Sequence, residues 1–276
     1  MVKTAWWVLA RRKGFADSAP EWVPALFGAV TLGFFTAAIP ILVGREWLTI
    51  SWALELGALC WLYQRRPHRG LLHAIALLGV GVSVRLLINP ALWSYYPRSG
   101  MPVLNFYLYT FGVPAVAFLA GAQWLENAIA GQRAAIPSGA PVEGGPHTSR
   151  LRLLLRIAAV VFVFFLVNVQ VADYFSQGET LTFHLRGASL TEDMTYSLAW
   201  GGFALCLLAL GIARDKLGLR IGALAVLTLT LVKVTLHDLW ELGGLYRVGS
   251  LIGVAFALLL VSFLTQRLVL RKPVVQ

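Results

Sequence analysis

The side chains best suited to chemistry lie close together near position 240. Lys233, His237 and Glu241 are four residues apart, so on a continuing helix they share one face, with Asp238 next to His237 and Arg247 a few residues later. A His-Asp-x-x-Glu arrangement offers metal-ligand atoms or an acid–base pair, and it equally suits an ion-pair network that caps a helix. Because no zinc spacing such as His-Glu-x-x-His occurs, we predict neither a metal nor a cofactor.

Three ionisable side chains fall inside long apolar runs: Glu55, Arg85 and Lys233. Charges at membrane depth are costly, so each is a candidate for function. Arg85 and Lys233 lie about one turn from the ends of their runs, where the alternative is a stem in lipid with the charged head at the interface. A lone carboxyl such as Glu55 would be protonated or paired, with Arg85 or a tryptophan indole as partner, and a purely structural hydrogen bond is the other interpretation.

The composition decides which kind of protein must position these residues. Of the 276 residues, 58% are apolar and 13% are charged, whereas soluble domains carry about 25% charged residues. The mean hydropathy is +0.72. A soluble globule of this size could not bury so many apolar side chains, so a soluble enzyme, a disordered chain and a fibrous protein are excluded. The class that remains is a polytopic membrane protein.

Apolar stretches of about 20 residues are long enough to cross a hydrocarbon core of about 30 Å. Eight such stretches predict an all-α polytopic transmembrane helix bundle; they cover 22–43, 47–63, 71–89, 105–125, 151–172, 195–213, 219–237 and 248–266. The expected divisions are an interfacial N-terminal segment 1–21, a first four-helix half 22–133, a flexible cytoplasmic linker 134–149, a second four-helix half 150–270 and a cytoplasmic tail 271–276. We expect the stretch 5–10 to form a retained interfacial helix, and 180–186 to form a short strand.

The basic residues predict the orientation. With eight crossings, 17 of the 23 lysines and arginines fall on one side of the membrane and four on the other, and Arg85 and Lys233 lie within spans. Cytoplasmic loops carry the excess of positive charge, so both termini are expected in the cytoplasm and the protein in a bacterial inner membrane. The net charge of +10 is therefore explained without nucleic acid, for which no aromatic-interleaved basic patch exists.

The linker separates two halves that share residues at a shift of 148 positions. The shift pairs chemically distinctive residues, as the following matches show: Trp52 with Trp200, Arg66 with Arg214, Gly70 with Gly218, and Arg85 with Lys233. An internal duplication of four-helix halves would make them parallel, related by an axis along the membrane normal. The alternative is two unrelated sets of helices with similarly placed positive charges in their loops.

Several segments resemble one family of bacterial predicted membrane proteins, the domain-of-unknown-function family 2339. The residues that carry the resemblance are Trp52–Glu55, Val103–Phe106, Phe111–Ala115, Leu231–Leu239 and Gly244–Ser250. The similarity covers roughly residues 28–270 and corresponds to the C-terminal part of the family's longer proteins. The resemblance implies the membrane class and the topology, and it brings no activity.

A structural role explains each candidate cluster at least as well as a catalytic role does. The leading expectation is therefore a non-catalytic structural or transport-associated envelope component. One alternative is an envelope enzyme that acts on a lipid-linked or periplasmic glycan at the outer face through Lys233, His237, Asp238 and Glu241. Another is a small-solute or proton-coupled transporter in which Glu55 titrates. The expected partner is the lipid bilayer, with another membrane protein chain as an open alternative and no nucleic acid.

Overall fold

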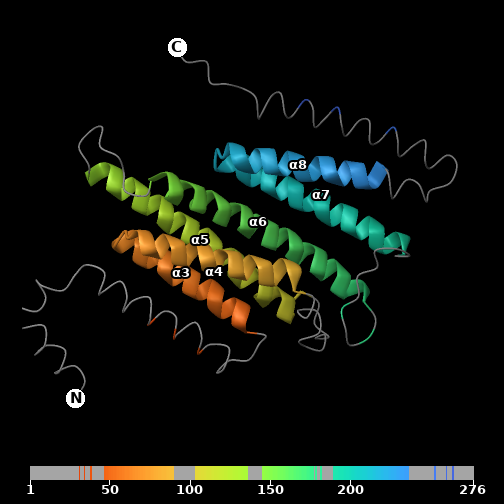
Figure 1. The fold of residues 1–276 in the computed structure, drawn as a ribbon. Helices are drawn as coiled ribbons and strands as arrows, with labels where there is room; N and C mark the ends of the chain where they lie inside the picture. The colour runs from red at the N-terminus through yellow and green to blue at the C-terminus, as the bar shows by residue number, and fades with distance from the viewer. Residues whose placement is uncertain are drawn as a thin grey trace, which may run out of the picture. The chain divides into compact units, whose positions relative to one another are not determined.

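The computed structural model describes residues 47–89, 103–135, 145–176 and 189–235, with single positions 31, 34, 38, 178, 181, 252, 259 and 263. In this part of the chain the regular secondary-structure elements are all helices, which Figure 1 shows. They are α3 (Leu48–Arg65), α4 (Arg69–Ile88), α5 (Phe106–Ala135), α6 (Gly145–Phe175), α7 (Leu190–Ala213) and α8 (Leu217–Lys233). The all-helical prediction is therefore confirmed for the described residues.

Four of these helices are long and apolar enough to cross a membrane, and they cover Arg69–Ile88, Phe106–Ala134, Gly145–Phe175 and Thr191–Ala213. Large apolar side chains on them point outward, such as Leu77 at 75% and Leu198 at 78% exposure. Such a surface fits lipid rather than water. α3 and α8 are shorter, with 18 and 17 residues. The expected spans 22–43 and 248–266 lie largely outside the described residues, so the count of eight is not confirmed.

Helix ends depart from the predicted ones where capping side chains set them. The Ser189 side chain accepts a hydrogen bond from the Glu192 N–H, and Glu192 and Asp193 occupy the first turn of α7. A hydroxyl cap and acidic residues both stabilise a helix N-terminus, so α7 begins before the predicted position 195. Helical structure also enters the segment predicted as a linker, because α5 continues to Ala135 and α6 begins at Gly145.

The chain divides into two compact units, and the division falls within α5 and α6. Unit 1 comprises Met1–Asn89 and Val116–Ile157, and unit 2 comprises Pro90–Ala115 and Ala158–Gln276. Each unit therefore contains one complete helical hairpin, α3–α4 in unit 1 and α7–α8 in unit 2, together with parts of α5 and α6.

Unit 1 packs α3 closely against α4 and α5. Gly121 of α5 lies where a Cβ would be 3.0 Å from the Cys60 Sγ of α3, so a small residue lets these two helices approach. The unit also holds an ion-pair cluster, since Glu126 of α5 accepts from Arg152 at 3.4 Å and from Arg156, both on α6. The core is formed by side chains with almost no exposed surface, including Leu56, Ile75, Val82, Phe118 and Leu125.

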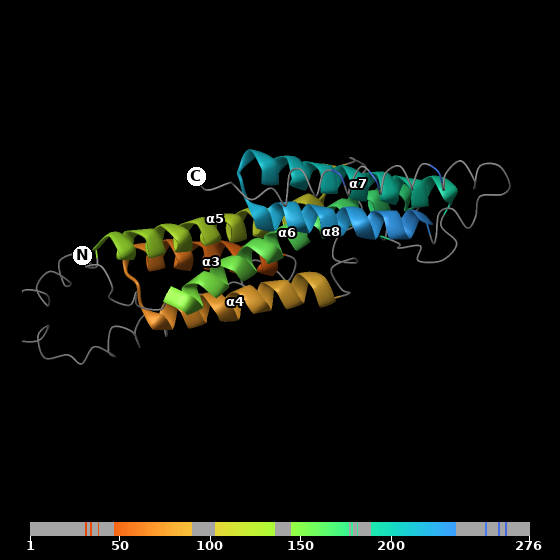
Figure 2. The same cartoon turned by 90° about the horizontal axis from the view of Figure 1, so that it is seen from above.

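Unit 2 joins α6, α7 and α8 through aromatic and aliphatic contacts. Phe164 of α6 packs against Trp200 and Phe203 of α7, with ring centroids 5.2 and 5.5 Å apart. Leu207 and Ala223 belong to a buried cluster that connects α7 with α8. Figures 1 and 2 agree that α7 and α8 lie side by side along their length.

Some expectations fall outside the described residues. They concern the N-terminal segment 1–21 with its interfacial helix at 5–10, the tail 271–276, and the short strand 180–186 apart from its buried Leu181.

Candidate functional site

Lys233, at the end of α8, reaches across to α7. Its Nζ donates to the Ser197 Oγ at 2.9 Å and to the Asp193 carbonyl oxygen at 3.1 Å, and it lies 4.0 Å from the Asp193 carboxylate. The Lys233 side chain is 17% exposed and that of Asp193 12% exposed. Lys233 also lies in the last turn of its helix, where a positive charge interacts favourably with the helix dipole. The ammonium group is therefore surrounded by oxygen atoms of the neighbouring helix.

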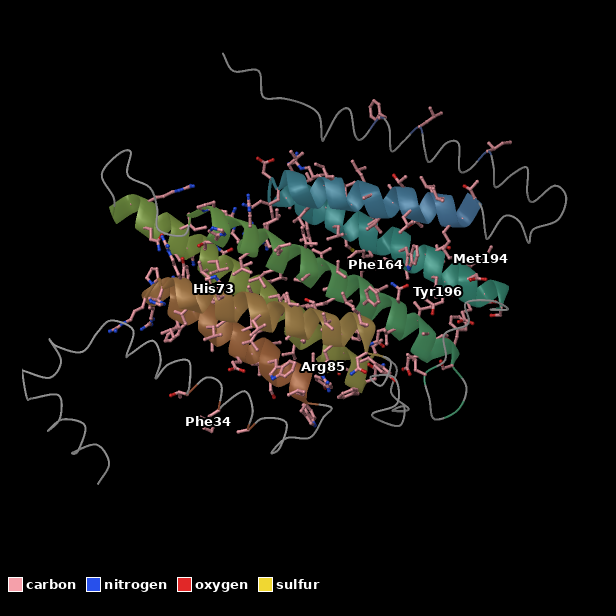
Figure 3. The ribbon with its side chains drawn as sticks, viewed as in Figure 1. Phe34, His73, Arg85, Phe164, Met194 and Tyr196 are labelled. Atoms are coloured by element: carbon pink, nitrogen blue, oxygen red, sulfur yellow. The ribbon has the colours of Figure 1, made fainter. Side chains whose placement is uncertain are left out.

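Arg85 makes a comparable contact in the other hairpin. It lies in the last turn of α4, and its Nε donates to the Thr49 Oγ1 at the start of α3, at 3.0 Å. Thr49 is almost fully buried. Figure 3 labels Arg85 toward the end of α4, far along the helix from His73 near its beginning. Of the predicted intramembrane charges, both cations thus bond to a hydroxyl on the preceding helix.

The two cation bonds occupy the same register. Each joins residues 36 positions apart in the sequence. The shift of 148 positions that pairs Arg85 with Lys233 also pairs Thr49 with Ser197. Donor and acceptor are thus related by a single shift, although the residue types differ, with arginine and threonine in one hairpin and lysine and serine in the other.

The turns of the two hairpins obey the same shift. α3 ends at Arg65 and α7 at Ala213, and α4 begins at Arg69 and α8 at Leu217. The backbone bonds that close the turns correspond as well: Arg66 N–H to Leu62 O with Arg214 N–H to Leu210 O, and Leu71 N–H to His68 O with Leu219 N–H to Lys216 O. Sequence and backbone geometry therefore agree at the helix ends that flank each turn, whereas α7 begins six residues earlier than the shift of α3 would place it.

Glu55 lies midway along α3 and is partly buried. The shift pairs it with Phe203, an uncharged residue that packs on Phe164. Glu55 therefore has no acidic counterpart in the second hairpin, and its predicted pairing stays a prediction.

A second polar cluster lies in unit 2, and the sequence did not predict it. Asn105 and Gln170 exchange side-chain amide hydrogen bonds of 2.9 and 3.0 Å, and the Asn105 Nδ2 also donates to the Asp173 carboxylate at 3.0 Å. Gln170 donates to the Val103 carbonyl oxygen, and Asn105 accepts from the Leu108 N–H at the start of α5. These bonds fasten α6 to the segment that leads into α5. The amide pairing is mutual, so the cluster is a structural connection.

The remaining candidates are not described. His237, Asp238, Glu241 and Arg247 lie outside the residues that the structure covers, so their predicted convergence with Lys233 is untested. Within the described ranges, no group of three or more His, Cys, Asp or Glu residues could hold a metal ion.

Sequence reasoning identified the two cations and missed the acceptors Thr49, Asp193 and Ser197. A signal was available, because the 148-residue shift pairs Thr49 with Ser197. Asp193 and Ser197 are also four residues apart and share one face of α7. Hydroxyl residues are common in membrane helices, so the pattern carries weight only when donor and acceptor shift together.

Comparison with known proteins gives one match. Residues 64–268 match the family model described as Predicted membrane protein (DUF2339), which is the family that the sequence resembles. The matched region begins further along the chain than residue 28, where the resemblance was expected to begin. No curated protein and no solved structure matches the chain.

Proposed function

The chain belongs to the DUF2339 family of predicted membrane proteins, and we propose that it is a non-catalytic structural or transport-associated component of the bacterial cell envelope. The observation that supports this proposal is the use made of its intramembrane cations. Arg85 and Lys233 are both bonded to the preceding helix, at equivalent positions of two hairpins. A residue kept for chemistry is expected once, whereas a residue that fastens a repeated unit is expected in each copy.

The energetics favour a structural use of these cations. On insertion scales an arginine or lysine costs about 2.5–3.5 kcal/mol at the centre of a membrane helix, which is an upper bound for Arg85 and Lys233 in the last turns of theirs. Hydrogen bonds to charged groups return about 1.5–3 kcal/mol. Bonds from Arg85 to Thr49, and from Lys233 to Ser197 and Asp193, therefore offset most of the cost of burying the charge. An amine held in this way is positioned for packing rather than for proton transfer.

We also propose that the two hairpins arose by duplication of a helical hairpin, within parallel halves of the protein. The support is the common shift of 148 residues for the helix ends at the turns, the turn bonds and the cation bonds. The excess of positive charge in cytoplasmic loops explains the arginines at the turns. It does not require a hydroxyl acceptor at the equivalent position in the first helix of each hairpin.

The proposed location is the inner membrane, with the turns at Arg66 and Arg214 and both termini facing the cytoplasm. Support comes from the distribution of lysine and arginine. Alkaline phosphatase fused after Asp193 is expected to be active and the same enzyme fused after Lys216 to be inactive, because α7 lies between the two points. The reverse result would contradict the orientation.

The role of Lys233 is tested by two variants in a strain that lacks the chromosomal gene. Lys233→Arg keeps a positive donor and is expected to complement the deletion fully. Lys233→Met removes the donor and is expected to lower the amount of folded protein, with function falling in proportion to that amount. Arg85→Lys and Arg85→Met, tested in parallel, are expected to behave in the same way.

A catalytic lysine would give the opposite pattern. Lys233→Arg would then abolish complementation at normal protein level and normal stability, while Arg85→Lys would restore it. This outcome would overturn the non-catalytic proposal and favour the envelope enzyme.

A further inference from the structure

A pocket of about 640 Å³ lies within unit 1, between the beginnings of α4 and α6. α4 contributes Arg69 and His73, and α6 contributes His147 and Arg150. All four side chains are exposed. Among the described residues, none that lines the pocket carries a carboxylate. The described lining of the mouth is therefore basic.

The helix ends add to this positive charge. α4 begins at Arg69 and α6 at Gly145, and neither helix has an acidic residue in its first turn. A helix N-terminus carries a partial positive charge of about half an elementary charge, which proteins usually complement with Asp or Glu. Arg69 begins α4, whose N-terminus is capped by the His68 side chain, and Arg150 follows five residues after the start of α6. A bound anion would interact favourably with the helix ends and with both arginines.

The rest of the lining is apolar. Leu72 and Ala76 of α4 and Leu151 and Leu154 of α6 line the pocket further along each helix. The polar mouth thus continues into an apolar part of the pocket. This part lies between two helices that are long and apolar enough to cross a membrane. A small soluble anion would use only the mouth, whereas an anionic amphiphile would use both parts.

We propose that this pocket binds a phosphate group carried by an anionic phospholipid. The arginine guanidinium groups form charge-assisted hydrogen bonds with the phosphate oxygens, and the first acyl carbons lie along the leucines. His73 is held in place because its Nδ1 bonds to the Arg69 carbonyl oxygen at 3.0 Å. α6 is held at this end by a 3.1 Å bond between the hydroxyls of Thr148 and Tyr63 of α3. His73 and the start of α6 are thus positioned before the ligand arrives, and the proposed site does not depend on whether the protein is catalytic.

The test uses the full-length chain in a neutral detergent and measures the thermal unfolding midpoint by circular dichroism. The probes are short-chain phosphatidylglycerol, short-chain phosphatidylcholine and inorganic phosphate, each titrated separately. We expect phosphatidylglycerol to raise the midpoint, and phosphatidylcholine and inorganic phosphate to have much smaller effects.

Two double variants separate this site from general surface charge. Arg69→Gln with Arg150→Gln removes both pocket arginines and is expected to weaken phosphatidylglycerol binding by about tenfold or more. Arg66→Gln with Arg133→Gln removes two exposed cations that do not line the pocket, and it is expected to bind as the unmodified chain does. Without lipid, the pocket variant is expected to remain folded, because Arg69 and Arg150 are both exposed.

Each outcome decides the proposal. Equal weakening in both double variants, or no response to phosphatidylglycerol, would overturn it. A pocket variant that unfolds without lipid would also count against it, since the charges would then be structural. A response to inorganic phosphate as strong as that to phosphatidylglycerol, lost only in the pocket variant, would support the phosphate site and overturn the lipid as its source.

Discussion

The hairpins α3–α4 and α7–α8 agree in the helix ends that flank their turns and in their cation bonds, and they differ in the residues inside the turns. Pro67 stands in the first turn at the position of Asp215 in the second. Asp215 has a φ of 47°, a left-handed conformation that proline cannot adopt. The Asp215 N–H also bonds to the Ile212 carbonyl oxygen, and proline has no N–H to replace it. The second turn therefore closes through its own backbone.

The two hairpins also differ at the position two residues before the end of their first helix. A Cβ on Gly211 of α7 would lie 2.9 Å from the backbone nitrogen of Arg220, so the helices of this hairpin meet closely. The equivalent residue in α3 is Tyr63, a buried phenol whose hydroxyl contacts that of Thr148 on α6. The first hairpin thus has room for a large side chain and is held from outside by another helix. The two hairpins thus share the cation bond at one end and differ in their contacts at the other.

The largest expected effect comes from giving the second turn the proline of the first. Asp215→Pro is incompatible with a φ of 47° and removes the bond to Ile212. We expect the free energy of unfolding to fall by about 3 kcal/mol, measured by denaturant titration in detergent. Asp215→Gly is the control, because glycine adopts positive φ without strain, and it should cost far less. Equal stability of the two variants would show that the turns do not differ in this way.

The next effect is at Gly211. Gly211→Ala places a methyl group against the Arg220 backbone and is expected to cost about 1–3 kcal/mol. Gly202→Ala on the same helix is the matched control, since no atom lies within 4 Å of its Cβ position. A melting temperature that is lower only for Gly211→Ala would support the close approach. An unchanged melting temperature would mean that the helices separate readily there.

The cation bonds are expected to have smaller and similar energies. Two double-mutant cycles test this, one with Thr49→Val and Arg85→Met, the other with Ser197→Ala and Lys233→Met. Each should give a coupling energy of about 1.5 kcal/mol, since both bonds join a charged donor to a hydroxyl. A coupling energy near zero in one hairpin alone would break the proposed equivalence.

The smallest difference is expected at the paired tryptophans. The Trp200 Nε1 donates to the Asn168 Oδ1 at 2.9 Å, while the Trp52 Nε1 is buried without a hydrogen-bond partner among the described residues. Trp200→Phe loses a bond, whereas Trp52→Phe removes a donor that bonds to no described atom. We expect Trp200→Phe to be the more destabilising by about 1 kcal/mol in thermal melts. The opposite order would indicate an acceptor for Trp52.

The sequence predicted the features that depend on local composition. Apolar runs located the six described helices, although the end of α5 at Ala135 lies ten residues beyond the predicted one, and the gaps between the runs located both turns. The ends were less well predicted where a single side chain decides them, as Ser189 does for α7. Helix capping is a bond between particular atoms, which hydropathy does not report.

The site was predicted less completely because its parts meet across helices. Arg85 and Lys233 stood out as charges in apolar runs, but their acceptors are ordinary hydroxyl residues that only the three-dimensional contact distinguishes. The pocket combines Arg69 with Arg150, which are far apart in sequence and meet only because α4 and α6 begin side by side within unit 1. Neither pairing follows from spacing along the chain.

Each hairpin is fastened twice, by its turn and by its cation bond, and these fastenings lie at opposite ends. Arg85 is 16 residues beyond the start of α4, about 24 Å along the helix axis. A pair of rods joined at both ends can neither slide lengthwise nor open like scissors. Each hairpin should therefore move as one rigid body, so any conformational change of this protein would have to occur at the contacts between a hairpin and other helices.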